Sequence, residues 1–227
     1  MNTNNLIRWS GLAALVGGLT FAGIQPIHPA DALASVTTDA WAIITAVKTV
    51  MCLLLLLGMT GLYARQADRA GRLGLAGFLL FSLSWALNLA FIFVEAFILP
   101  LLATSEPAFV DGILKFVGGQ PTEVNLGVFA PLFLVNGLFY MLGGLLFGIA
   151  TLRAGILPRR AAGLLAVAAA LTPLAALLPH ELQRLAGMPV GFAVAWLGYA
   201  LWSERREQAA ERLSGTGGSK LSPSAAR

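Results

Sequence analysis

Two ionisable side chains, Lys48 and Glu95, lie inside apolar stretches of the sequence. Charged groups within a membrane-spanning helix are costly, so they often mark a functional site. Each residue is about eight positions from the end of its stretch, which at 1.5 Å per residue places both roughly 10 Å below one membrane surface. This equal depth predicts that the two side chains can meet as an ion pair. The alternative is a structural role, with Lys48 extended toward the surface and Glu95 already within the interface.

Two asparagines extend this polar set. Asn88 precedes Glu95 by two helical turns and shares its helix face, while Asn136 lies in a separate apolar stretch. We therefore predict a shallow polar cavity lined by Lys48, Asn88, Glu95 and Asn136. The alternative is that the two asparagines only form hydrogen bonds between helices.

Evidence for metal or cofactor chemistry is weak. His28 and His180 are the two histidines of the chain, and each lies next to a proline at the end of an apolar stretch. With Glu95 or Asp31 they are weak candidates for a zinc site, but there is no HExxH motif. There is also no GxSxG motif and no phosphate-binding glycine loop. We predict no cofactor and no metal, and an enzyme is the less favoured class.

The elements that carry these residues are expected to be membrane-spanning helices. The 227-residue chain is 57% hydrophobic and 11% charged, whereas soluble domains carry about 25% charged residues. Some apolar stretches reach or exceed the roughly 20 residues needed to cross a bilayer, and they lack the alternation of barrel strands. We predict an all-α bundle of six transmembrane helices over residues 1–204, followed by a partly disordered cytoplasmic tail over 205–227. The predicted spans cover residues 6–24, 40–64, 73–102, 124–152, 161–178 and 185–202.

The basic residues predict how the bundle is oriented. Twelve Lys and Arg fall on one side of the spans and two, Lys115 and Arg184, on the other, with Lys48 inside a span. Because cytoplasmic loops are enriched in Lys and Arg, both termini are expected in the cytoplasm and the protein in the cell inner (plasma) membrane. The net charge of +4 then reflects topology, and nucleic-acid binding is not expected. If instead 30–32 is a signal-peptide cleavage site, five spans remain and the N-terminus lies outside.

Residues 8–14 resemble residues 160–166, and His28 falls at the same offset as His180. A duplication would arrange the six helices as three parallel hairpins, whereas shared composition of helix ends is the alternative explanation.

Three segments resemble parts of a family of bacterial six-span membrane proteins of unknown function: 58–67, 72–78 and 147–159. The resemblance covers most of the membrane part but consists mainly of helix ends. It implies no activity, cofactor or site residue.

The function that these observations favour is binding without catalysis. We predict an outward-facing polar pocket that takes a small molecule, a lipid or a partner, in a protein whose surroundings are the lipid bilayer and whose partners are other membrane proteins or further copies of itself. The alternatives are a transporter-like permeation unit, an intramembrane metal-dependent hydrolase, and a structural subunit of a larger complex.

Overall fold

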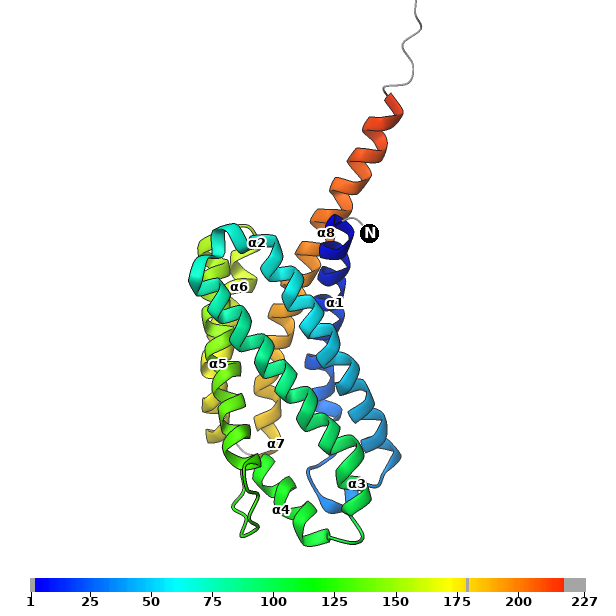
Figure 1. Ribbon diagram of the computed structural model, residues 1–227, viewed down its shortest axis with the longest axis vertical. Coiled ribbons are helices and arrows are strands. Elements are labelled where there is room, and N and C mark those ends of the chain that lie inside the picture. The colour runs from blue at the N-terminus through cyan, green and yellow to red at the C-terminus, as the bar shows by residue number, and fades with distance from the viewer. Residues whose placement is uncertain (1–2, 179, 219–227) are drawn as a thin grey trace, which may run out of the picture.

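The computed structural model describes the backbone of residues 3–178 and 180–218, and the side chains of 5–178 and 182–204. All regular secondary structure in these ranges is helical, as predicted (Figure 1). Within them, five helical segments are long and apolar enough to cross a membrane. They are Asn5–Ile27, Asp39–Leu102, Phe129–Ala154, Arg159–Leu177 and Arg184–Glu204.

The expected second and third spans form one continuous segment of 64 residues. Its main part is α2, Asp39–Phe93, which is helical throughout except at Gly71, with φ 59° and ψ −161°. Only glycine adopts this conformation readily, because a Cβ atom would clash with the backbone. At Gly71 the chain turns back on itself, so α2 consists of a first arm, 39–70, and a second arm, 72–93 (Figure 1). The predicted connection between the spans is therefore a single glycine and not a loop.

Several predicted boundaries differ from the structure for local reasons. The first helix, α1, covers Thr3–Ile24 and begins before residue 6. α5 covers Phe129–Ala154, so residues 124–128 of the expected fourth span are not helical. Gly127 has φ 53° there, and its N–H donates to the Asn125 side chain at 2.9 Å, which closes a turn. The third span ends in a change of helix type, because a π-helix, Val94–Ile98, leads into α3, Leu99–Leu102.

The last two spans also depart from regular α-helix, in the segment that connects them. α6 covers Arg159–Leu171 and continues as a 3-10 helix, Thr172–Leu177, where Pro173 cannot supply an α-helical N–H. The short α7, His180–Gln183, and a 3-10 turn, Arg184–Gly187, lead into α8, Met188–Gly218. α8 continues into the predicted tail, and residues 219–227 of that tail lie outside the described residues.

One helix was not anticipated from the sequence. α4, Pro107–Val117, lies in the connection between α3 and α5. Its buried face contains Val110, Ile113 and Leu114. These residues pack with Trp41 and Leu99 in a hydrophobic cluster that is separate from the main core of the bundle. At 11 residues it is too short to cross a bilayer, and it covers the end of the bundle opposite the Gly71 turn (Figure 1).

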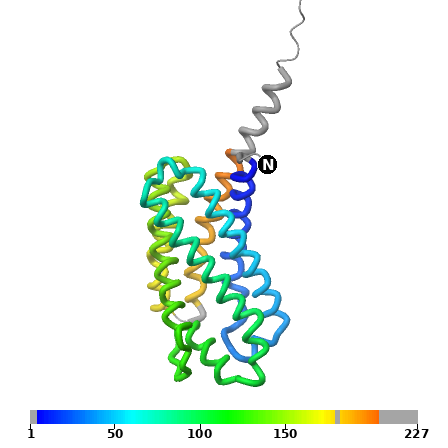
Figure 2. The backbone as a smooth tube through the Cα atoms, in the orientation of Figure 1, coloured from blue at the N-terminus to red at the C-terminus, as the bar shows by residue number. Residues whose placement is uncertain are grey.

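Close helix packing holds the bundle together. α1 runs beside α8, and the second arm of α2 runs beside α5 (Figure 2). At Gly18 an added Cβ would lie 2.5 Å from the carbonyl oxygen of Gly191, and at Gly143 it would lie 2.4 Å from the backbone nitrogen of Phe81. Small residues at such crossings let the backbones approach closely.

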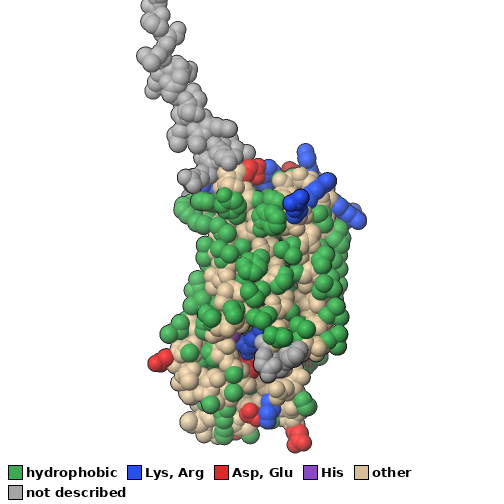
Figure 3. All heavy atoms as spheres, turned by 180° about the vertical axis from the view of Figure 1, so that it is seen from behind, with side chains coloured by type: hydrophobic (Ala, Val, Ile, Leu, Met, Phe, Trp, Pro, Cys, Tyr) green, Lys and Arg blue, Asp and Glu red, His purple; other side chains and the backbone are tan. Residues whose placement is uncertain are grey.

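Basic side chains gather at one end of the molecule. Figure 3 shows Lys and Arg at the end that holds the Gly71 turn, beyond a belt of hydrophobic side chains. The belt includes exposed residues from both arms of α2, from α5 and from α8, among them Leu57, Leu79, Leu134 and Phe192. Such a belt suits contact with lipid.

Candidate ligand-binding site

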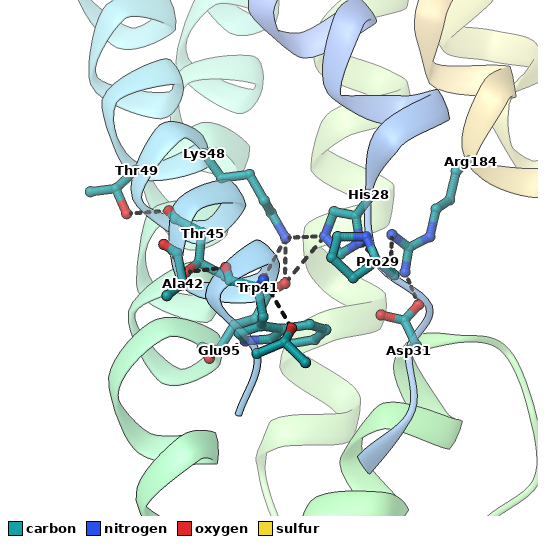
Figure 4. A network of polar contacts seen from close by, with 11 residues as sticks. His28, Pro29, Asp31, Trp41, Ala42, Thr45, Lys48, Thr49, Glu95 and Arg184 are labelled. Carbon is teal, nitrogen blue, oxygen red and sulfur yellow. Dashed lines mark hydrogen bonds and ion pairs between the residues drawn. The ribbon is translucent and has the colours of Figure 1, made fainter. Parts of the chain in front are cut away.

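The site is centred on the two charges singled out in the sequence. Lys48, on the first arm of α2, donates to both carboxylate oxygens of Glu95, at 2.6 Å and 2.5 Å (Figure 4). Glu95 lies on the π-helix that follows the second arm. Each side chain is 17% exposed. The two residues that the sequence places at one depth below the membrane surface thus form a direct ion pair.

His28 completes a group of three. Its Nδ1 lies 2.7 Å from the carbonyl oxygen of Pro29. A carbonyl oxygen only accepts, so Nδ1 carries the proton, and in the neutral ring Nε2 is an acceptor. Nε2 lies 3.1 Å from the Lys48 ammonium nitrogen and 3.4 Å from Glu95 Oε1. All three N–H bonds of Lys48 are therefore used, two by Glu95 and one by His28.

The π-helix explains how Glu95 is held. The N–H of Leu99 donates to the carbonyl of Val94, one residue further back than in an α-helix. Pro100 has no N–H to offer to Glu95. The carbonyl oxygen of Glu95 is thus left free by its own helix, and it accepts a hydrogen bond from the Trp41 indole nitrogen at 3.0 Å. π-helical turns are rare and often occur at functional sites.

A second ion pair flanks the first. Arg184, in the turn before α8, pairs with Asp31 in the loop after α1, and it also lies 3.5 Å from the carbonyl oxygen of Pro29 (Figure 4). Arg184 is one of the two basic residues in the connections on the lysine- and arginine-poor side of the spans, and Asp31 neutralises its charge. The pair connects the loop that carries His28 to the start of α8.

These groups line one cavity of about 390 Å³. All four residues predicted for a polar pocket, Lys48, Asn88, Glu95 and Asn136, contribute to its wall. Asn136 donates to Asn88 at 3.3 Å, so the asparagines also join the second arm of α2 to α5. The remaining wall is largely apolar and aromatic, and Ile113, Leu114 and Val117 of α4 cover the end near the loops. Its aromatic members are Phe21, Trp41, Trp85, Phe91, Phe129, Phe133 and Tyr140.

Three polar atoms next to the cavity have no hydrogen-bond partner among the described residues. They are Trp85 Nε1, Asn136 Oδ1 and Tyr140 Oη. Each atom is almost completely buried, so it lies behind the surface of the wall and does not face the open space. Unpaired buried polar atoms cost stability.

The weak metal candidates do not form a metal site in the part of the chain that the structure describes. No three His, Cys, Asp or Glu side chains gather there as a metal would require. His28 is committed to Lys48, and Asp31 to Arg184. The backbone of His180 begins α7, and its side chain lies outside the described residues.

Three features of the site were missed in the sequence. Trp41 is 1% exposed and donates to the main-chain carbonyl of Glu95, a contact that the sequence did not indicate. Arg184 departed from the charge pattern, and that departure was the available signal for a nearby acid. α4 showed only one apolar helix face over a segment of 11 residues.

Comparison with protein-family models, curated proteins and solved structures gives no match to this chain.

Proposed function

We propose that the protein crosses the cell inner membrane six times, with both termini in the cytoplasm. The two arms of α2 count as separate crossings, because the chain reverses at Gly71. The arginine-rich end then faces the cytoplasm, in keeping with the enrichment of basic residues there. The cavity, near α3 and α4, faces the outer side.

We propose that this cavity binds a small molecule or a lipid without catalysing a reaction. The observation that carries the proposal is that one cavity of about 390 Å³ contains all four predicted polar residues within a mainly apolar, aromatic wall. Ligand pockets commonly have this size and this combination of an apolar wall with few polar groups. The polar side chains are held by contacts between segments that lie far apart in the sequence, so their positions are set before any ligand arrives.

A permeation unit is the second candidate, and it has less support. It requires a polar path toward the arginine-rich end. A second cavity lies there, lined by Arg65, Gln66, Asp68, Arg69, Gly155 and Ile156, and it shares no residue with the first. Between them the core is filled by buried apolar side chains, including Leu55, Met59, Phe81 and Phe147. A hydrolase has no metal cluster to support it among the described residues.

Filling the cavity tests the binding function. Gly137 lines the cavity, and a Cβ atom there would meet nothing within 4 Å. Gly137→Phe should therefore occupy the cavity without disturbing the fold. Gly23 is equally open but does not line the cavity, so Gly23→Phe is a matched control.

The readout is native mass spectrometry of protein purified in a mild detergent. We expect the unmodified protein and Gly23→Phe to retain the same small molecule, and Gly137→Phe to lose it. Equal retention by both variants would show that the molecule binds elsewhere, and no retained molecule in any form would contradict the proposed binding.

A further inference from the structure

The charges in the cavity wall cancel one another. Two cationic groups, Lys48 and Arg184, face two carboxylates, Glu95 and Asp31, and each cation is in direct contact with one acid. His28 lies against both members of the first pair, with Nε2 3.1 Å from the Lys48 ammonium nitrogen and 3.4 Å from Glu95 Oε1. An ion of either sign would lose its hydration on entry and meet no unpaired opposite charge, which is costly in an apolar site.

The hydrogen bonds that remain available differ between these groups. The three N–H bonds of Lys48 are all used within the cluster. A carboxylate has about four acceptor positions. Lys48 uses two of those of Glu95, and His28 Nε2 lies 3.4 Å from Oε1. The Glu95 side chain is still 17% exposed. The central cluster can therefore accept a further hydrogen bond more readily than it can donate one.

We propose that the cavity selects an uncharged, mainly apolar molecule whose hydroxyl or amide N–H group donates a hydrogen bond to the Glu95 carboxylate. This inference rests on the proposed binding function and adds the chemical class of the ligand. The aromatic wall takes the apolar body of the molecule, and α4 covers the end near the loops. The fixed Lys48–Glu95 pair orients the polar end without being broken.

The test uses four probes that share one ring system. These are 2-naphthalenemethanol, its methyl ether, 2-naphthoate and 2-naphthylmethylammonium. The alcohol and the ether differ in one hydrogen-bond donor, and the other two carry a negative and a positive charge. Binding is measured by calorimetry on protein in lipid nanodiscs, with empty nanodiscs subtracted. We expect the alcohol to bind at least about tenfold more tightly than the ether, because hydrogen bonds to charged groups are among the stronger ones.

A double variant connects this preference to Glu95. Lys48→Met with Glu95→Leu removes both charges together and keeps the space filled, a change that proteins often tolerate. It should reduce the alcohol-to-ether ratio to about one. Asp111→Leu with Lys115→Met removes an ion pair on the outer face of α4. Neither of these two residues lines the cavity, so this variant should leave the alcohol-to-ether ratio unchanged. Thermal unfolding of both variants checks that they are folded.

Each other outcome overturns the inference. Equal binding of alcohol and ether, tighter binding of a charged probe, or an alcohol preference that survives loss of Glu95 would contradict the ligand class while leaving a binding cavity in place. Failure of all four probes also contradicts it. The retention experiment with Gly137→Phe then decides separately whether the cavity binds anything.

Discussion

The indole N–H of Trp41 donates to the main-chain carbonyl of Glu95, at 3.0 Å, across 54 residues of sequence. That carbonyl is available because the π-helix directs the N–H of Leu99 to Val94 and because Pro100 has no N–H. The start of the first arm of α2 is thereby fixed to the residue that bears the central carboxylate. The positions of Lys48 and Glu95 thus depend on a main-chain contact as well as on their own charges.

Loss of this contact should be measurable. Trp41→Phe leaves the carbonyl of Glu95 without a donor, and an unpaired buried polar group costs about 1–3 kcal/mol. We expect a clear fall in the thermal unfolding temperature. Trp196→Phe, at a position that is 43% exposed, is the matched control and should have little effect.

Pro100→Ala separates the hydrogen bond from the lost indole volume. The alanine supplies the N–H that Pro100 lacks, so the Glu95 carbonyl gains a donor within its own helix. The cost of Trp41→Phe should then be smaller in the Pro100→Ala background by about 1 kcal/mol. Additive costs in equilibrium unfolding would show that the indole hydrogen bond contributes nothing.

Because Lys48 and Glu95 form a mostly buried ion pair, removing either charge alone should destabilise the protein. Lys48→Met leaves an unpaired carboxylate in a mostly buried position, and such changes cost about 3 kcal/mol or more. Lys48→Glu with Glu95→Lys restores an ion pair and should recover part of the stability that either single reversal loses. A double reversal no more stable than the single ones would exclude a direct pairwise interaction.

The contacts of His28 predict its tautomer. Nδ1 donates to the Pro29 carbonyl and Nε2 accepts from Lys48, so neutral His28 should carry its proton on Nδ1. Nitrogen-15 NMR on a His180→Gln variant observes the single remaining ring. A proton on Nε2 would contradict this arrangement, because two donors would then face each other.

Close packing of the second arm of α2 on α5 gives a test of the fold. A Cβ at Gly143 would lie 2.4 Å from the backbone nitrogen of Phe81, whereas a Cβ at Gly137 meets nothing within 4 Å. Gly143→Ala should destabilise the protein by about 1–3 kcal/mol. Gly137→Ala lies on the same helix and should be neutral or slightly stabilising, because alanine favours helix. Similar unfolding temperatures for the two variants would contradict the packing.

The sequence was sufficient to predict apolar helices and to place Lys48 and Glu95 at one depth, since both follow from hydropathy and from distance along a helix. It left open whether the two side chains pair, which depends on how the two arms of α2 pack. It was not sufficient for the π-helix, which depends on how the hydrogen bonds rearrange around Pro100. The proline is visible in the sequence, but the hydrogen bonds that form once its N–H is missing are not. The one-residue turn at Gly71 was missed because the surrounding arginines indicated a loop.

The remaining parts of the site depend on tertiary contacts. His28 and Asp31 are brought to the cluster by the loop after α1, and Arg184 by the turn before α8. No periodicity in the sequence relates these segments. α4 becomes part of the site only because its apolar face packs on Trp41 and Leu99.

The proposed binding function requires that the cavity is open to the outer side of the membrane. Asn88 lines the cavity, and Ala86, two residues earlier on the same helix, is exposed and lies outside the lining. Single cysteines at these positions, in a Cys52→Ala background, are treated in intact cells with a charged thiol reagent that does not cross membranes. We expect rapid labelling of Asn88→Cys and little labelling of Ala86→Cys, which would face lipid. Labelling of Asn88→Cys only after the cells are opened would contradict an outward-facing pocket.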